Sequence, residues 1–381
     1  MAPPNEEIAV IGSSIAGLAV ARVLADFGHP VTVFDRRRDF RDDGFGICLP
    51  QTVYINAIGE GLITGQLPVF TLTRRRWLRK DARTRRSVEL WDQEVAPSVV
   101  ALRWSSLRDA LASRVPRSVT QNHATARSVD IVGSRVRIEF ADCAAQLFDH
   151  VVGADGVHSV VRSAQIPVTP RLASYRCWRG TITSYTPPAG IRVHDGITIV
   201  FDGGHLVAYP VPGPAGAAVL NWVLYSSRHE EAVDVEDALP SDWAELIDLA
   251  RAGPFPVRDL ELPQNAMERH LLVGDAASIT RPHTASGASK ALTDAMTLRR
   301  LLHGYGDIDS SRRAFADLRI PAGNELVHLG RRLGRSQVES TPAWNTMNAE
   351  TLQAWAMATV AGADSYLYKE KLIGSGRKLR S

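Results

Sequence analysis

Cysteine is scarce in this chain of 381 residues, and its scarcity argues against a disulfide framework and against a cysteine-ligated metal centre. Cys48, Cys143 and Cys177 are odd in number and scattered, without the spacing of metal ligands. We therefore predict neither a disulfide framework nor a metal centre, and we expect a cytoplasmic protein because its thiols suit a reducing compartment.

Long apolar runs are also lacking. No run of eighteen apolar residues occurs, which excludes a membrane-spanning helix. Glu6 and Glu7 lead directly into an apolar segment, so we expect no signal peptide. The composition is otherwise that of an ordinary globular protein, and the length fits two packed domains.

A large excess of one charge is absent, since the formal net charge is +3. Eight basic residues and one acid lie between Arg74 and Arg86, a local charge of +7 that leaves about −4 for the remainder. This distribution argues against a nucleic-acid-binding protein. We interpret residues 71–93 as a solvated hairpin with Trp77 and Trp91 facing inward; a surface for a phosphorylated cofactor or an acidic partner is the alternative.

The first motif lies near the amino terminus. Residues 8–11 predict a buried strand that runs into a Gly-Ser-Ser-Ile-Ala-Gly motif at residues 12–17 and then into an amphipathic helix. A second strand, residues 30–34, ends at Asp35 and completes a βαβ dinucleotide-binding unit. Asp35 is placed to bind a ribose diol, which favours FAD or NAD over a 2′-phosphorylated cofactor.

Three positions of this motif have distinct roles. Gly12 permits a tight turn, and Gly17 permits close packing of the helix on the strand. Ser14 stands where the usual fingerprint has glycine; a serine is small enough to be tolerated there, and its hydroxyl can itself bond a phosphate. Further along, the pattern predicts a glycine-rich turn at 44–47, helices at about 50–62 and 102–111, and a hairpin of strands 127–132 and 135–140.

The second motif is residues 151–162, VVGADGVHSVVR. An apolar strand ends in Gly-Ala-Asp-Gly, and a helix follows with Ser159 as its N-cap. Asp155 and Arg162 are candidate cofactor contacts at this strand end. A buried ion pair between these two side chains is the alternative.

The pattern changes between residues 175 and 262. Strands at 197–201, 205–211 and 217–225 predict an antiparallel sheet that forms a second lobe. Together, Trp178, Arg179, His205, Tyr209 and Trp222 would form one wall of a cleft that suits a flat substrate; a core or surface position for any one of them is the alternative.

The chain is organised around its third motif, residues 271–302. A short buried strand is followed by Gly274-Asp275, by a loop of small residues at 284–289 and by a helix. Backbone N–H groups at such a helix start can face an anionic or electron-rich ligand, and Asp275 can accept hydrogen bonds from a polyol. A buried strand capped by a helix, without a ligand, is the alternative. Further helices are predicted at 310–337 and about 344–360.

The three motifs, GSSIAG with Asp35, GADGVHSVVR, and VGDAAS followed by RPHTASGASKA, resemble those of the class A flavoprotein monooxygenases, the p-hydroxybenzoate hydroxylase-like group. Their order and spacing cover nearly the whole chain. The segments YRCWRGTI, GGHLVAYPVPG and RPHTASGASKALTDAMTL are similar to the 2,6-dihydroxypyridine 3-hydroxylase-like branch, in which a serine at the position of Ser14 also occurs.

The resemblance implies an α/β fold. A Rossmann-type FAD-binding domain would comprise residues 1–170 with 265–340, including the basic hairpin at 71–93. An inserted antiparallel-sheet substrate domain would comprise residues 171–264. Residues 341–381 would add a carboxyl-terminal helix and a mobile tail.

By the same resemblance, FAD lies extended across the first domain, with Asp35 at its adenosine ribose, Asp275 at its ribityl chain and the loop 282–289 beside its isoalloxazine ring. Trp104 stands near the place where many relatives have an arginine that contacts the flavin. The implied cofactor contacts are Gly12, Ser14, Ile15, Ala16, Gly17, Asp35, Arg36, Gly46, Trp104, Asp155, Arg162, Gly274, Asp275, Gly287, Ala288 and Ser289.

The implied chemistry is that of the cofactor. NADH or NADPH reduces the flavin, and O₂ then forms a flavin hydroperoxide that hydroxylates an electron-rich phenol or hydroxypyridine-like ring. The protein must exclude water and position the ring. His283 is the candidate for removing the substrate proton, because histidine titrates near neutrality and this one follows Pro282 in the loop beside the ring. A histidine hydrogen-bonded to the loop backbone is the alternative. Tyr209, His205 and Pro282 are candidate substrate contacts.

Two other functions fit parts of the sequence. A flavin-dependent tailoring enzyme on the same fold would epoxidise or dehydrogenate a larger natural product. A binding module would use Arg74 to Arg86 to bind an acidic partner. We expect a monomer or homodimer whose partners are the substrate, O₂ and NAD(P)H, without nucleic acid or membrane.

Overall fold

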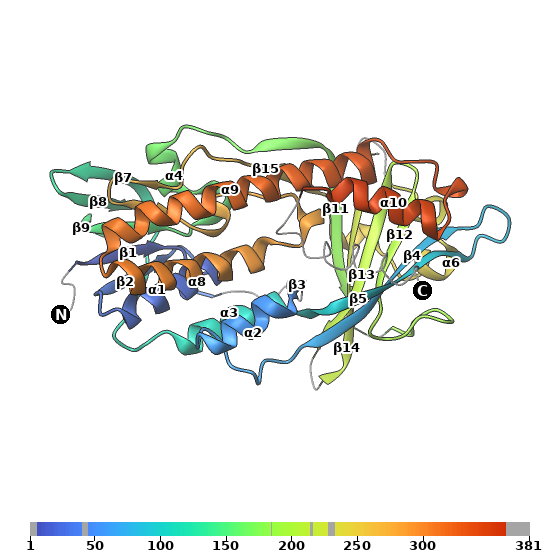
Figure 1. Cartoon of the computed structure of the whole chain (residues 1–381), viewed down its shortest axis with the longest axis horizontal. Coiled ribbons are helices and arrows are strands. Elements are labelled where there is room, and N and C mark those ends of the chain that lie inside the picture. The colour runs from blue at the N-terminus through green and yellow to red at the C-terminus, as the bar shows by residue number, and fades with distance from the viewer. Residues whose placement is uncertain (1–5, 40–44, 184, 214–215, 228–232, 363–381) are drawn as a thin grey trace.

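The computed structural model of the chain describes residues 6–39, 45–183, 185–213, 216–227 and 233–362. Figure 1 shows an elongated molecule with a sheet toward each end and a long helix, α9 (Ile308–Gly334), that runs alongside both. No helix in these ranges is long and apolar enough to cross a membrane. The tail predicted to be mobile falls outside the described residues from 363 onward.

Sheet A contains six strands in the order β16-β17-β10-β1-β2-β6. All are parallel except β16, which is antiparallel to β17. The bounds are β1 (Ile8–Ile11), β2 (Val31–Asp35), β6 (Thr120–His123), β10 (His150–Gly153), β16 (Ala266–Met267) and β17 (His270–Leu272). The strands predicted in the three motifs are confirmed, and they are neighbours in this sheet.

Sheet A is covered on both faces. One face carries α1 (Ile15–Asp26), α3 (Trp104–Arg114) and α8 (Gly287–Tyr305). The other carries α4 (Val160–Gln165) and a small sheet C of β7 (Ala126–Val132), β8 (Arg135–Phe140) and β9 (Gln146–Phe148). Alternate residues of β1 enter the two layers, which explains why that strand is apolar throughout.

Sheet B contains eight strands in the order β15-β11-β14-β13-β12-β4-β5-β3. Only the β12–β4 pair is parallel. The bounds are β3 (Gly46–Pro50), β4 (Phe70–Lys80), β5 (Ser87–Arg103), β11 (Arg171–Ile182), β12 (Gly196–Phe201), β13 (Gly204–Pro212), β14 (Ala218–Ser226) and β15 (Phe255–Asp259). The three strands predicted between 197 and 225 are confirmed as β12, β13 and β14.

Helices pack around sheet B and link it to sheet A. The helix α10 (Ala349–Val360) packs with α9 over Trp77 and Trp91, which confirms that these two rings face inward. Beyond α9 the chain makes a π-helical turn, Arg335–Glu339, that contacts β11 and β13. The remaining helices are α2 (Gln51–Gly59), α5 (Val235–Ala238), α6 (Ser241–Ala244) and α7 (Leu249–Ala252).

The basic hairpin is confirmed as β4 and β5, and both of its strands pair within sheet B. It therefore belongs to the same sheet as the strands of the predicted substrate domain. The residue limits of the two predicted domains stay a prediction.

The predicted turn at 44–47 is wrong for Gly46 and Ile47, which begin β3 and pair with β5. A Cβ at Gly46 would lie 2.7 Å from Val211 and 2.9 Å from Asn221, and the Gly46 N–H donates to Asn221 Oδ1 at 2.7 Å. Glycine is required here because the backbone passes close to two other strands, not because the chain turns.

Candidate active site

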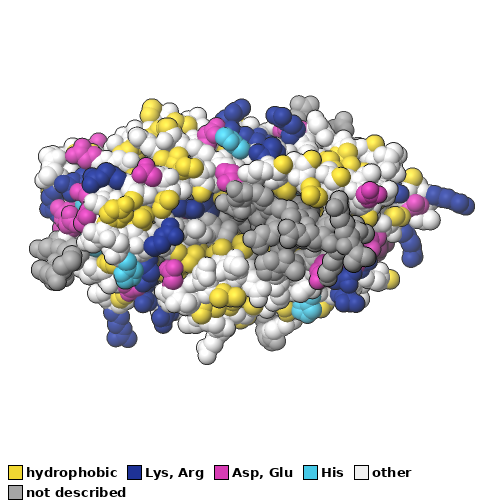
Figure 2. Space-filling model, in the orientation of Figure 1, with side chains coloured by type: hydrophobic (Ala, Val, Ile, Leu, Met, Phe, Trp, Pro, Cys, Tyr) yellow, Lys and Arg dark blue, Asp and Glu magenta, His cyan; other side chains and the backbone are white. Residues whose placement is uncertain are grey.

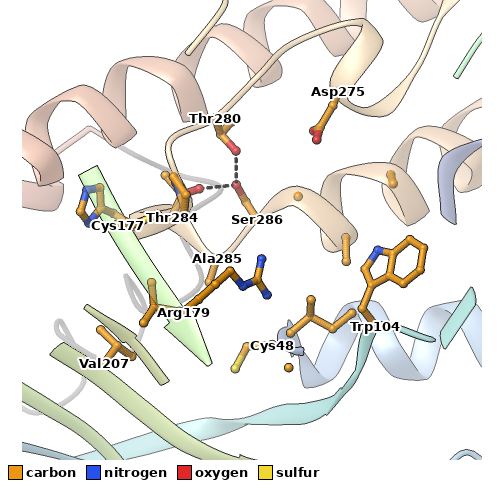
Figure 3. Close-up of a pocket in the computed structure, with 18 of the residues that line it drawn as sticks. Cys48, Trp104, Cys177, Arg179, Val207, Asp275, Thr280, Thr284, Ala285 and Ser286 are labelled. Carbon is orange, nitrogen blue, oxygen red and sulfur yellow. Dashed lines mark hydrogen bonds between the residues drawn. The ribbon is translucent and has the colours of Figure 1, made fainter. Parts of the chain in front are cut away.

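A cavity of about 430 Å³ lies between the carboxyl ends of β1 and β17 in sheet A and one face of sheet B. Figure 3 shows Trp104 and Asp275 toward one side of it and Cys177 and Val207 toward the other. The predicted site residues that line it are Ser14, Ile15, Ala16, Gly46, Trp104, His205, Tyr209, Gly274, Asp275, Pro282, His283, Gly287 and Ala288. Those outside its lining are Gly12, Gly17, Asp35, Arg36, Asp155, Arg162 and Ser289.

Gly12 and Gly17 shape the turn that brings α1 to the cavity. Gly12 has a φ of 105°, and a Cβ there would lie 2.7 Å from the Ala154 carbonyl carbon. A Cβ at Gly17 would collide with the carbonyl oxygen of Gly12. The predicted tight turn and close packing are confirmed.

Asp35 holds this turn from the end of β2. Its Oδ2 accepts hydrogen bonds from the backbone N–H of Ser13 at 2.7 Å and from the Ser13 hydroxyl at 3.1 Å. Its Oδ1 accepts from the Arg37 N–H at 2.8 Å. The predicted contact between Asp35 and a ribose stays a prediction.

The second motif stabilises the turn after β17, which borders the cavity. Ser159 caps α4 as predicted, since its hydroxyl accepts from the Arg162 N–H at 2.9 Å. The alternative of an Asp155–Arg162 ion pair is wrong. Asp155 accepts from the Val160 N–H at 2.6 Å, and burial raises its pKa. The buried Arg162 guanidinium donates to the carbonyls of Val157 and Ala276, at 2.6 and 3.1 Å, which ties this segment to the turn after β17.

His283 lies partly buried in the cavity wall and forms a side-chain hydrogen bond rather than the backbone bond considered as its alternative. Its Nε2 is 2.7 Å from the Tyr175 hydroxyl, which accepts from Arg281 Nη1 at 3.3 Å. Because that hydroxyl accepts from Arg281, its own proton is directed to His283 Nε2, and the His283 hydrogen is left on Nδ1. Nδ1 is buried and has no hydrogen-bond partner among the described residues.

Neither histidine in the cavity is protonated near neutral pH. Burial lowers the pKa of His283 well below 6.5, and nearby His205 and Arg281 lower it further. Burial and the charge of Arg75 lower the pKa of His205 to about 3. The expectation that His283 titrates near neutrality is therefore wrong, because the closed wall of rings desolvates an imidazolium.

The face of sheet B toward the cavity carries two cations: Arg179, which was predicted as part of the cleft wall, and Arg75, which was predicted only as part of the basic hairpin. Arg179 reaches from β11 toward the middle of the cavity (Figure 3), where its guanidinium lies 3.8 Å from the centre of the Phe45 ring. Its buried Nε has no hydrogen-bond partner among the described residues. Arg75 also lines the cavity; it donates to the Thr198 hydroxyl at 2.9 Å and lies over Trp77.

A period-two pattern separates Arg179 from the tryptophans that were predicted with it. Tyr175, Cys177 and Arg179 alternate along β11; Cys177 and Arg179 line the cavity and Tyr175 contacts His283 in its wall. Trp178, between them, is buried in the core on the opposite side, as is Trp222. Those two tryptophans, predicted as cleft wall, are therefore core residues.

Hydroxyl groups organise the loop before α8. The Ser286 hydroxyl lies 2.6 Å from that of Thr284 and 3.4 Å from that of Thr280, as the dashed lines in Figure 3 show. Ala285 between them has a φ of 49°. These residues line the cavity; the predicted loop 282–289 included all of them except Thr280, but their hydroxyl contacts were not predicted.

Part of the basic hairpin is engaged within the fold. Arg74 and Arg76 pair with Asp92 and Glu89 on the neighbouring strand, and Lys80 donates to two backbone carbonyls. Figure 2 shows basic side chains projecting at the end of the molecule where β4 and β5 turn in Figure 1. These contacts favour the solvated-hairpin interpretation.

Comparison with solved structures identifies the fold. The chain matches 2,6-dihydroxypyridine-3-hydroxylase from Arthrobacter nicotinovorans with a TM-score of 0.74 and 23% identity, over 91% of this chain and 97% of that one. It matches Klebsiella pneumoniae HpxO, solved with FAD and uric acid, with a TM-score of 0.75 and 18% identity, over 97% and 95% of the two chains. Both show the fold of FAD-dependent monooxygenases.

Curated relatives show the family. A 3-amino-4-hydroxybenzoate 2-monooxygenase of Streptomyces cremeus is 30% identical over 86% of each chain. A salicylate hydroxylase of Pseudomonas putida is 28% identical over 96% of this chain and 90% of that one. No protein-family model matches the sequence. The chain belongs to the class A FAD-dependent aromatic monooxygenases. It is a flavoprotein of the aromatic hydroxylase type, which uses FAD with NAD(P)H and O₂.

The residues at the cavity fit FAD. Gly274 has a φ of 58°, and a Cβ there would lie 2.8 Å from that of Ala16, so the turn after β17 and the start of α1 approach closely beside the cavity. The first turns of α1 and α8 both face this space, and their unpaired N–H groups can bind electron-rich atoms. Asp275 adds the carboxylate suited to a polyol chain.

Proposed function

We propose that this monooxygenase hydroxylates a single electron-rich ring that carries both an ionisable hydroxyl group and a carboxylate. The observation that carries the proposal is Arg179, whose buried Nε is unpartnered in the cavity. Asp275 is the only acid that lines the cavity in the described part of the chain, and it comes from sheet A. Arg75 and Arg179 on sheet B thus favour an anion on the substrate side.

The relatives' names agree with such a substrate. They include enzymes of 3-amino-4-hydroxybenzoate, salicylate and 6-hydroxynicotinate, whose substrates are rings with a hydroxyl group and a carboxylate. The dihydroxypyridine enzymes among the relatives and neighbours act on a ring named without a carboxylate. The cations of sheet B favour the first group.

In the proposed site, residues 14–17 hold the pyrophosphate of FAD, Asp35 and Arg36 lie toward its adenosine ribose, and Asp275 binds its ribityl chain. The loop 282–289 and Trp104 lie beside its ring. When bound, FAD supplies the activation of O₂ with electrons from NAD(P)H. The protein's own tasks are to exclude water, to orient the substrate with Arg179 and Tyr209, and to stabilise the substrate's hydroxyl oxygen as an anion.

We assign the last task to His283. With a lowered pKa it is a weak base, but its Nδ1–H can donate to an anionic substrate oxygen. His283→Ala should keep FAD and uncouple NAD(P)H oxidation from hydroxylation, with the coupled fraction falling roughly 100-fold, the lower end of the range for a positioned proton-handling group. Product formed per NAD(P)H consumed is the measurement.

Tyr175→Phe provides the comparison, since it removes the hydroxyl that fixes the His283 tautomer and leaves the imidazole in place. We expect an intermediate loss of coupling. Unchanged coupling and hydroxylation in His283→Ala would remove His283 from the mechanism.

The test of the proposed function compares a hydroxybenzoate with the corresponding hydroxybenzamide, through the change each makes in the visible spectrum of bound FAD. The wild type should prefer the carboxylate. In Arg179→Met the Kd of the carboxylate should rise about 10- to 100-fold, the value of a charge-assisted hydrogen bond, while that of the amide changes little.

Arg83→Met is the matched control, because Arg83 is exposed on the basic hairpin, and it should leave both Kd values unchanged. A carboxylate preference that survives in Arg179→Met would contradict the proposal. Transfer of one atom of labelled O₂ to a small ring product separates hydroxylation from dehydrogenation of a larger compound. The monomer-or-homodimer state, the cytoplasmic location and the absence of nucleic-acid and membrane partners remain predictions.

A further inference from the structure

Two buried charged side chains on α8 face the turn that follows β17. Lys290 and Asp294 lie one helical turn apart, and each is 3% exposed. A charged group is seldom so buried without a specific partner, because leaving water is costly. Both find their partners in the segment from Gly274 to Ser278 and in the neighbouring helix.

Lys290 binds the two ends of this segment together. Its Nζ donates to the carbonyl oxygen of Ser278, to the Ser278 hydroxyl at 3.1 Å and to Asp275 Oδ1 at 3.3 Å. The ammonium thus uses its three protons on three acceptors, and only one of these is a carboxylate.

Asp294 fixes the start of the same segment. Its Oδ2 accepts from the Gly274 N–H at 2.9 Å, and its Oδ1 accepts from Arg319 Nε of α9 at 2.7 Å. Gly274 has a φ of 58° and lies close to Ala16, so its peptide must keep one orientation. The four charges of Lys290, Asp275, Asp294 and Arg319 balance.

The consequence falls on Asp275. Its side chain remains 46% exposed at the cavity, and Lys290 engages Oδ1 only. Oδ2 has no hydrogen-bond partner in the described part of the chain, and Figure 3 shows the carboxylate directed into the cavity.

We propose that Lys290 and Asp294 are positioning residues that hold Asp275 with one oxygen presented to the ribityl hydroxyls of FAD. This inference rests on the proposed FAD contact of Asp275. The ribityl chain is uncharged and bonds to the carboxylate, so Lys290 acts on it through Asp275 and not by attraction of its own.

The experiment titrates apoprotein with FAD and follows the quenching of flavin fluorescence, which reports the Kd of FAD without turnover. Lys290→Met should raise that Kd about 10- to 100-fold, the value of one lost charge-assisted interaction. Arg299→Met is the matched control. Arg299 is a second cation of α8, it pairs with Asp26 at 2.8 Å far from the turn, and its loss should change the Kd less than about twofold.

A double-mutant cycle separates positioning from general damage. Asp275→Ala should weaken FAD by itself, and Lys290→Met added to it should produce little further loss. Full additivity of the two losses, or a Lys290→Met variant that binds FAD as the wild type does, overturns the proposal. If Lys290→Met does not fold, Asp294→Asn decides in the same assay, with unchanged FAD affinity as the refuting result. Failure of the wild type to bind FAD would instead refute the proposed FAD-binding site.

Discussion

Asp259→Asn should lower the free energy of unfolding by about 3 kcal/mol, the lower range for breaking a buried ion pair. Asp259 is fully buried at the end of β15; it accepts from Arg281 Nε at 2.8 Å and from Arg331 Nε and Nη2 at 2.9 and 2.7 Å. An amide cannot compensate two guanidinium groups and would turn a donor toward one of them. Urea denaturation of both proteins, with equal slopes, measures the difference.

The effect should extend to the cavity, because Arg281 also donates to the Tyr175 hydroxyl that binds His283. Glu7→Gln is the comparison. Its pair with Arg135, at 2.6 Å, has side chains 37% and 54% exposed, and its loss should change stability by less than about 1 kcal/mol. Equal losses in the two variants would show that the buried position of Asp259 has no special value.

Acid should destabilise this protein through His205. The ring is 1% exposed, and burial lowers its pKa to about 3, whereas the unfolded chain has a value near 6.5. Below pH 6.5 the unfolded state binds a proton that the folded state refuses, so stability falls with falling pH, by up to about 1.4 kcal/mol per pH unit. Between pH 7 and pH 5 this one group should remove about 2 kcal/mol.

The measurement is the free energy of unfolding at several pH values for the wild type and for His205→Gln. The difference between the two curves should shrink or change sign as the pH falls, because only the wild type has this proton uptake. His158→Gln, at an exposed position, should run parallel to the wild type. Parallel curves for His205→Gln as well would mean that His205 is not held neutral in the folded protein.

Most of sheet A, and the turns of the three motifs beside the cavity, could be predicted from the sequence because they depend on local signals. The turn at Gly12, the cap at Ser159 and the strand before Gly274 each follow from a few adjacent residues. Sheet B was predictable only in part. Its hairpins show as alternation, but the parallel pairing of β12 with β4 joins segments more than a hundred residues apart.

The chemistry of the cavity was less accessible for the same reason. The low pKa of His283 is caused first by burial and then by His205 and Arg281, and the burial depends on segments distant in the sequence. The alternation of residues along β11 predicts that Arg179 faces the cavity. That its Nε has no hydrogen-bond partner among the described residues is known only from the structure. Gly46 was misread because a turn and a close approach of strands demand the same residue.

The helix α9 connects the two halves of the molecule. It packs on α8 and β16 beside one sheet, and its end continues into the turn that touches β11 and β13 in the other (Figure 1). The helix therefore connects the two halves rigidly along one edge, which disfavours a large hinge opening between them. Substrate entry and product release would then depend on local rearrangements around the opening of the cavity.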